Sequence, residues 1–194
     1  HANTIVEWGI NPLTAWPGLQ GPHLLEAKAR GAKLIVVDPR FTDLAAKADI
    51  WLQIRPGTDG ALALGMMNIL IEEGLYDKEF VDKWTLGFDQ LAERVKEFPV
   101  DRVSEITWIP KEKILAATRM MANNRPTTST ISLGACMHTN GMQHGRAISD
   151  LFGILGDIDA KGGLLSNKFW DVMLVPEITK MDQSRLSALL GDET

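Results

Sequence analysis

The hydrophobic positions of the chain alternate between short β-branched runs and longer stretches with helical spacing. Residues 4–9 (Thr-Ile-Val-Glu-Trp-Gly) predict a buried strand that ends at a glycine. Residues 33–37 are almost wholly apolar, which is typical of a parallel strand covered on both faces. Between them, residues 23–30 predict a short helix that ends at Gly31. The three segments together predict a βαβ unit.

The same alternation continues to about residue 155. Further strands are predicted at residues 49–54 and 127–133, and further helices at residues 61–73, 110–123 and 144–155. Around residues 77–110 the pattern becomes amphipathic and rich in charge, which we interpret as a helical insertion on the surface, with Asp77 and Asp89 as expected N-caps. The predicted fold is therefore α/β, with a Rossmann-like parallel sheet covered by helices on both faces. We expect residues 1–168 to form one domain and residues 169–194 to be a tail that packs on other parts.

Composition excludes several classes of function. The chain has 194 residues, with 20 Lys and Arg against 25 Asp and Glu, so a surface that tracks nucleic-acid phosphates is not expected. The single cysteine, Cys136, excludes an internal disulfide framework and an iron–sulfur cluster ligated by this chain alone. The histidines have no HExxH spacing, so we expect no metal ligands. No signal-peptide pattern or membrane-spanning apolar run is visible, and either the cytoplasm or the periplasm fits the sequence.

Candidate chemistry lies in the loops that follow the predicted strands, because parallel sheets bind ligands at the carboxyl ends of their strands. Asp38 ends the second strand, and its carboxylate can accept two hydrogen bonds from ribose hydroxyls or from a guanine edge. Arg40 suits a phosphate or a carboxylate. Alternatively, Asp38 and Pro39 form a strand-end turn and Arg40 is its solvated neighbour.

Two more loops have both a functional and a structural interpretation. Gly57 and Gly60 allow a backbone to approach a ligand closely, whereas Thr58 and Asp59 can equally cap the helix that follows. Neither GxGxxG nor a P-loop sequence is present. His138 lies in a glycine-flanked loop and is the only histidine with a functional interpretation; a hydrogen-bonded loop histidine is the alternative. Cys136 is expected to be a small loop or semi-buried residue and not a nucleophile.

Taken together, these motifs resemble the molybdopterin oxidoreductase family, which includes dimethyl sulfoxide reductase, formate dehydrogenase, nitrate reductase and thiosulfate or polysulfide reductase. The resemblance extends over about residues 4–168. It rests on consecutive blocks in the family's usual order: Trp8-Gly9-Ile10-Asn11-Pro12, residues 32–40 ending in Asp38-Pro39-Arg40, residues 54–64 with Arg55-Pro56-Gly57-Thr58-Asp59-Gly60, His138-Thr139-Asn140-Gly141, and residues 155–163.

The resemblance implies a role for each motif. The chain would be an α/β domain that holds one of two molybdopterin guanine dinucleotides, with Asp38 at the guanosine end and Arg40 beside it. The implied second wall of the nucleotide site consists of Gly57, Thr58 and Asp59, and the residues nearer the pyrophosphate and pterin are Asn11, Gly134, Cys136 and His138. Two positions depart from the family pattern: Met137 replaces a polar residue that is often Gln, and Asp157 replaces the usual Asn.

The resemblance also implies a larger parent enzyme, of which this chain would be an internal fragment without catalytic residues of its own. The parent would transfer electron pairs or oxygen atoms at molybdenum or tungsten, and its [4Fe–4S] cluster would lie outside this chain. The expected partners are the cofactor, the remaining domains of the same polypeptide and an iron–sulfur electron-transfer subunit. Two alternatives come from other classes: an independent nucleotide-binding enzyme, such as an NAD-dependent dehydrogenase using Asp38 on a ribose, and a structural scaffold without a ligand, whose loops would scatter over different faces.

Overall fold

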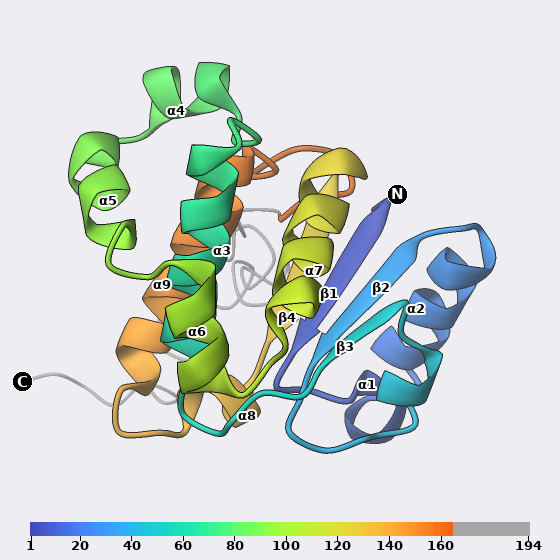
Figure 1. The fold of residues 1–194 in the computed structure, drawn as a ribbon. Coiled ribbons are helices and arrows are strands. Elements are labelled where there is room, and N and C mark those ends of the chain that lie inside the picture. Colours follow the sequence, from blue (N-terminus) through green and yellow to red (C-terminus); the bar gives the residue numbers. More distant parts are fainter. Residues whose placement is uncertain (165–194) are drawn as a thin grey trace, which may run out of the picture.

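Four parallel strands form a single sheet in the computed structural model, which describes residues 1–164 (Figure 1). The strands are β1 (Thr4–Trp8), β2 (Lys33–Val37), β3 (Ile50–Leu52) and β4 (Thr127–Ile131), in the order β3-β2-β1-β4. In the register, Val6 of β1 is paired with Ile35 of β2 on one side and with Ser129 of β4 on the other. The predicted tail, residues 169–194, and the boundary at 168 lie outside the described residues.

The sheet separates two hydrophobic clusters because side chains alternate between its faces. On one face, Ile5 and Leu34 pack with Leu24 and Ala27 of α2 (Gln20–Ala29). The short helices α1 (Pro12–Ala15) and η1 (Ala45–Lys47) lie on the same side as α2 (Figure 1). All five residues of β1 are buried, so this strand is the centre of the sheet.

On the other face, Val6, Trp8 and Leu52 belong to the larger cluster, which is covered by α3 (Asp59–Glu72), α7 (Lys111–Asn123) and α9 (Gly141–Leu155) (Figure 1). Helix α3 is central to this layer and contacts both α7 and α9. Its sequence is apolar on nearly all sides, as expected for a helix enclosed by other helices. The predicted α/β fold with helices on both faces of a parallel sheet is confirmed.

The predicted insertion consists of three helices, α4 (Lys78–Trp84), α5 (Phe88–Val95) and α6 (Val100–Thr107). Asp77 caps α4 as predicted and accepts a 2.8 Å hydrogen bond from the backbone N–H of Phe80. The prediction that Asp89 is an N-cap is wrong, because Gly87, with φ +82°, occupies that position.

The insertion is also more than a surface feature, because Val81, Val95 and Val103 are buried in the larger core cluster. Helix α6 approaches α3 so closely that a Cβ at Gly65 would lie 2.5 Å from a methyl carbon of Val103. The interpretation of these helices as a surface addition is therefore corrected: they complete the core on one side of α3.

Several element boundaries differ from the prediction. Strand β3 ends at Leu52, because the backbone N–H of Arg55 pairs with the carbonyl of Thr107 at the end of α6 rather than with a neighbouring strand. After β4, a short helix α8 (Leu133–Cys136) replaces the end of the predicted strand, so Gly134 is helical. Helix α9 begins at Gly141, three residues before the predicted start. Within residues 1–164, none of the helices is long and apolar enough to cross a membrane.

The segment after α9 turns back to the amino end of β4. There the Asp157 carboxylate accepts hydrogen bonds from Arg125 Nε at 3.1 Å and from the backbone N–H of Thr127 at 2.9 Å. Arg125 also pairs with Asp77 at 3.0 Å, which joins this corner to the N-cap of α4. Asp157, the departure from the family pattern, thus has a structural partner at the edge of the sheet opposite the loops that follow the strands.

We expect Asp157→Ala to destabilise the 194-residue chain by about 2–4 kcal/mol, because it leaves Arg125 and the Thr127 N–H without their buried acceptor. The measurement is the free energy of unfolding from denaturant titration. A matched control is Asp101→Ala, which breaks an exposed ion pair with Lys111 and should change stability by less than about 1 kcal/mol. Equal effects of the two substitutions would show that Asp157 does not stabilise this corner of the fold.

A second buried carboxylate, Glu7, lies in the middle of β1 on the α2 side of the sheet. Its Oε1 accepts a 3.4 Å hydrogen bond from Gln20, and its Oε2 is buried without a hydrogen-bond partner among the residues that the structure describes. Burial raises the pKa of Glu7 from its ordinary value of 4.5 to about 8, although the hydroxyl of Thr130 favours the charged form. The folded chain therefore holds this proton over a range of pH in which the unfolded chain has lost it.

The raised pKa gives the sign of a pH effect on stability. The contribution of protonated Glu7 is fully present below pH 4.5 and is lost as the pH rises to about 8. We expect Glu7→Gln to match the parent at pH 4 and to exceed it above pH 8 by up to about 5 kcal/mol, at 1.36 kcal/mol per pKa unit. Denaturant titrations across this range measure the difference, and a difference that does not change with pH would show that Glu7 has no such shift.

Candidate functional site

Polar loops follow all four strands at the carboxyl edge of the sheet, as predicted from the parallel order. The loops after β1, β2 and β4 enclose a cavity of about 490 Å³. Its lining is Gly9, Ile10, Asn11, Thr14, Ala15, Arg40, Phe41, Thr42, Asp43 and Ser132. The sequence-predicted residues Asn11 and Arg40 therefore share one cavity, and Asp38 lies immediately before its β2 loop.

Two glycines bring the ends of β1 and β4 together. Gly9 has φ +65°, and its carbonyl accepts a 3.2 Å hydrogen bond from the N–H of Gly134. A Cβ at Gly134 would lie 2.6 Å from that carbonyl oxygen, closer than any real side chain approaches. A glycine at position 134 is thus required for backbone contact between the loops. This requirement is independent of the predicted proximity of Gly134 to a ligand.

Asp38 is buried and rigidly held. Its Oδ1 accepts a 2.8 Å hydrogen bond from the backbone N–H of Arg40, and its own carbonyl accepts one from the indole of Trp51 at 2.9 Å. The turn that the structural alternative anticipated is therefore present. Within residues 1–164 the hydrogen bonds of this carboxylate use Oδ1 alone, so the turn leaves Oδ2 available as an acceptor.

Arg40 supplies a positive charge beside the cavity. Its side chain is 79% exposed and its Nε lies 4.0 Å from Asp38 Oδ1, a distance at which the pair contributes little binding between the two groups. The guanidinium is consequently available for an anion.

Asn11 has one satisfied and one unsatisfied group. Its Nδ2 donates to Asp43 at 2.6 Å and to Thr14 at 3.1 Å, which fixes the orientation of the amide. Its Oδ1 is buried and has no hydrogen-bond partner among residues 1–164. A buried carbonyl without a donor costs about 1–3 kcal/mol, and a ligand N–H or O–H in the adjoining cavity would remove that cost.

The Gly57–Gly60 segment differs from what the sequence predicted. Thr58 occupies the N-cap position of α3, but its hydroxyl donates to the carbonyl of Arg55 at 2.7 Å and makes no cap hydrogen bond. Asp59 is the first residue of α3, and its Oδ1 accepts a 2.8 Å hydrogen bond from the indole of the buried Trp8. Capping by these side chains is therefore wrong, and the carboxylate of Asp59 is directed into the protein.

His138 and Cys136 lie on the connection between β4 and α9. His138 is exposed, and its Nε2 lies 3.1 Å from the carbonyl oxygen of Gly134, as the hydrogen-bonded alternative anticipated. Cys136 ends α8 and is exposed, so the prediction of a semi-buried residue is wrong. The two residues belong to the same edge as Gly57, because a Cβ at Gly57 would lie 3.6 Å from His138 Nδ1.

Asp59 is the most perturbed acid at this edge. Burial raises the pKa of its carboxyl above the ordinary value, opposed by the hydrogen bond from Trp8 and by His144 and His138. Its buried Oδ2 has no hydrogen-bond partner in the described part of the chain and lies 3.7 Å from Nδ1 of His144. Sequence reasoning did not identify His144, because it lies within a helix pattern that explained it fully.

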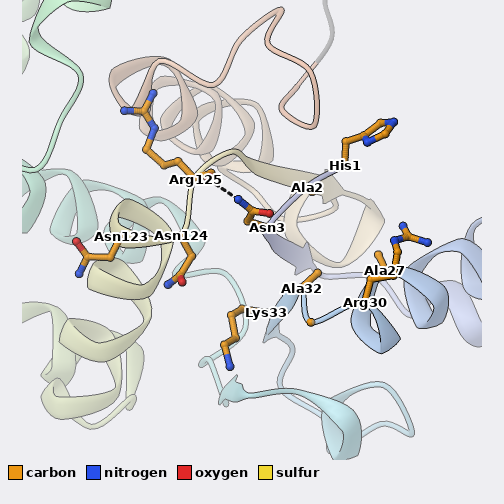
Figure 2. A pocket seen from close by; sticks show the side chains of 11 residues that line it. His1, Ala2, Asn3, Ala27, Arg30, Ala32, Lys33, Asn123, Asn124 and Arg125 are labelled. Carbon is orange, nitrogen blue, oxygen red and sulfur yellow. Dashed lines mark hydrogen bonds between the residues drawn. The ribbon is translucent and has the colours of Figure 1, made fainter.

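A second cavity, of about 480 Å³, opens at the opposite, amino edge of the sheet. Figure 2 shows Asn3 donating to the carbonyl of Arg125, while the guanidinium of Arg125 extends away from the other lining residues. That guanidinium is already paired with Asp77 and Asp157. The cavity is polar but holds none of the sequence-predicted site residues, so the carboxyl edge is the candidate site.

The carboxyl edge offers the chemistry of binding an elongated polar ligand. Among the described residues it combines a buried carboxylate acceptor, a solvated guanidinium, an amide carbonyl without a donor, and Phe41, a residue that is 66% exposed. Phe41 was not predicted, since a single aromatic in a loop carries no sequence signal. Within residues 1–164, no group of three or more His, Cys, Asp or Glu side chains is arranged to hold a metal ion.

Comparisons with known proteins agree with one another. Residues 1–176 match the family model described as molybdopterin oxidoreductase. The chain is 40% identical over 174 residues to the acetylene hydratase of Syntrophotalea acetylenica, covering 88% of this chain and 24% of that protein. It is 36% identical over 161 residues to the F420-dependent formate dehydrogenase subunit alpha of Methanocaldococcus jannaschii, covering 83% and 24%.

Two further matches extend this result. The molybdopterin-containing subunit of the thiosulfate reductase of Salmonella typhimurium is 36% identical over 171 residues, covering 86% of this chain and 22% of the subunit. Among solved structures, acetylene hydratase from Pelobacter acetylenicus superposes with a TM-score of 0.76 at 42% identity, covering 80% of this chain and 22% of that one. The chain thus spans about a quarter of the length of these relatives.

The contact between Gly9 and Gly134 can be tested directly. We expect Gly134→Ala to destabilise the chain by about 2 kcal/mol or more, because the new methyl group meets backbone that cannot move aside. Gly18→Ala is the matched control: nothing lies within 4 Å of its Cβ position, so its stability should stay within about 1 kcal/mol of the parent. Thermal and denaturant unfolding compare the two, and a neutral Gly134→Ala would show that the loops can separate without cost.

Proposed function

Because the chain belongs to the molybdopterin oxidoreductase family, we propose that it is the domain that binds one guanine dinucleotide form of the molybdopterin cofactor in a larger enzyme. Family membership implies a molybdopterin cofactor carrying molybdenum or tungsten. The guanine dinucleotide form is supported by one observation: the buried Asp38 carboxylate is held at the end of β2 beside a solvated Arg40 and a cavity of about 490 Å³.

The residues at this cavity fit the nucleotide end of such a group. In the proposal, Asp38 accepts hydrogen bonds from the guanine edge through its available Oδ2, and Arg40 neutralises a phosphate. Phe41 offers an exposed ring face on which a base can stack. The unsatisfied Oδ1 of Asn11 gains a donor from the ligand, which removes the cost of a buried carbonyl without a hydrogen bond.

The other loops fit the remaining length of the cofactor. Gly57 and Thr58, after β3, form the proposed second wall, and Asp59 supports that wall from inside the protein. Gly134, Cys136 and His138 lie after β4 and are proposed to face the pyrophosphate and pterin. Backbone N–H groups and the His138 ring can bind and orient these parts without taking part in chemistry.

The cofactor itself supplies electron-pair or oxygen-atom transfer at its metal. This chain contributes binding and orientation, and its one cysteine, Cys136, cannot ligate a [4Fe–4S] cluster, so a cluster in the whole enzyme would use other cysteines. We propose that the remaining domains of the polypeptide complete the site, and that an iron–sulfur subunit accepts or delivers electrons. The related proteins are each about four times longer than the matched region, which leaves room for such further domains.

The two alternatives are disfavoured by specific observations. An independent NAD-dependent dehydrogenase is disfavoured because residues 1–176 match the molybdopterin oxidoreductase family model. A scaffold without a ligand predicted loops on different faces, whereas the loops after β1, β2 and β4 line one cavity.

The proposal predicts that the 194-residue chain binds GDP more tightly than ADP. Asp38→Asn should weaken GDP binding roughly ten- to hundredfold and abolish the preference over ADP, because the amide keeps an acceptor for the Arg40 N–H but loses the charge that pairs with the guanine edge. Isothermal titration calorimetry measures both affinities. Asp101→Asn, at a distant exposed carboxylate, should bind as the parent does. A parent chain without any preference for GDP would refute the guanosine assignment.

A further inference from the structure

Two histidine rings occupy the space above the two glycines that flank Thr58 and Asp59. A Cβ at Gly60 would lie 3.0 Å from Cδ2 of His144, and a Cβ at Gly57 would lie 3.6 Å from Nδ1 of His138. The ring centroids are 6.3 Å apart. The glycines therefore make room for His138 of the β4–α9 connection and for His144 of α9, and these contacts join the loop after β3 to the chain that follows β4.

His144 is buried and its Nδ1 faces two acceptors. It lies 3.2 Å from the carbonyl oxygen of Ala135 and 3.7 Å from Oδ2 of Asp59. A carbonyl oxygen can only accept, so Nδ1 must carry the hydrogen. The same N–H is thereby directed at the α8 backbone and towards the one oxygen of Asp59 that has no hydrogen bond.

Asp59 in turn holds the end of β1. Its Oδ1 accepts the 2.8 Å hydrogen bond from Trp8, immediately before Gly9. Removing the histidine would take away the N–H that is directed towards the unpaired Oδ2 of this buried carboxylate, which is costly in a poorly solvated site. The lowest-cost response is for the first turn of α3 to move outward and hydrate Asp59, which would also displace Gly57 and Thr58.

We infer that His144 is a positioning residue. Through Asp59 and Ala135 it fixes the Gly57–Gly60 segment relative to α8, so the distance between the loop after β3 and the segment after β4 stays constant. The geometry that carries this inference is independent of any ligand. Its consequence for binding rests on the proposed function, since Gly57, Thr58 and Gly134 are proposed to contact the cofactor.

The first experiment uses the indole N–H of Trp8 as a spectroscopic reporter of the Asp59 carboxylate. In the ¹⁵N-tryptophan-labelled 194-residue chain, Trp8→Phe assigns the resonance. His144→Leu, which retains the bulk of the ring, should shift it, whereas His144→Asn, whose Nδ2 replaces the Nδ1 donor, should restore most of the parent position. His23→Asn alters an exposed histidine and should leave the resonance unchanged.

The second experiment measures GDP affinity by calorimetry. His144→Leu should bind GDP roughly tenfold more weakly, because the displaced Gly57–Gly60 segment loses part of its contact with the ligand, and His144→Asn should recover most of that loss. If Asn and Leu variants behave alike in both measurements, His144 only fills space and the inference is overturned. A Leu variant identical to the parent overturns it equally.

Two further outcomes remain informative. If His144→Leu does not fold, Asp59→Asn replaces it: its amide keeps the acceptor for Trp8 but directs N–H groups at His144, and it should shift the indole resonance and weaken GDP binding. A parent-like Asp59→Asn would overturn the inference. If the parent chain does not bind GDP, the proposed function fails, while the indole shifts still decide the role of His144.

Discussion

The buried hydrogen bond between the indole of Trp8 and the carboxylate of Asp59 joins the central strand to the helix that covers it. Trp8 is the last residue of β1, and Asp59 is the first of α3. Because β1 is paired on both sides, any displacement of its end moves β2 and β4 as well. This one contact therefore fixes the position of the carboxyl ends of three strands, and with them the start of the loops that follow.

The central strand carries a stability cost on each of its faces. Glu7 is buried on the α2 side and Asp59 lies against Trp8 on the α3 side, and burial raises the pKa of both carboxyls. Buried carboxylates of this kind are less stabilising than apolar residues of similar size. Asp59 has a compensating use, since it connects β1, α3 and His144, whereas Glu7 bonds only with neighbouring polar side chains.

The sequence predicted the fold well where periodicity carries the information. The apolar strands and the enclosed helix α3 follow directly from residue patterns, since burial on all sides leaves few polar positions. The Gly57–Gly60 segment was harder to interpret, because a glycine indicates a close approach without naming the approaching group. His138 of the β4–α9 connection and His144 of α9, both distant in sequence, approach this segment, so the contact of His144 can be seen only once the helices are packed. Asp38 was identified correctly as a strand-end carboxylate, since its position depends on local order alone.

The geometry of the edge also limits the shape of what it can hold. Neighbouring strands lie about 4.8 Å apart, so the ends of β2 and β4, two spacings apart, are separated by roughly 10 Å. Asp38 and Arg40 lie after β2, while Gly134 and His138 lie after β4, with Asn11 after β1 between them. A compact ligand could occupy the cavity that these loops line, but contact with both the Asp38–Arg40 pair and the Gly134–His138 segment requires an elongated molecule lying across the strand ends. In the proposed arrangement its base would lie at β2 and its other end at β4. Where Gly9 and Gly134 meet, neither residue has a side chain that would project over the strand ends and block such a ligand. The two glycines that allow the loops after β1 and β4 to come into contact therefore also leave the space that an elongated ligand would need.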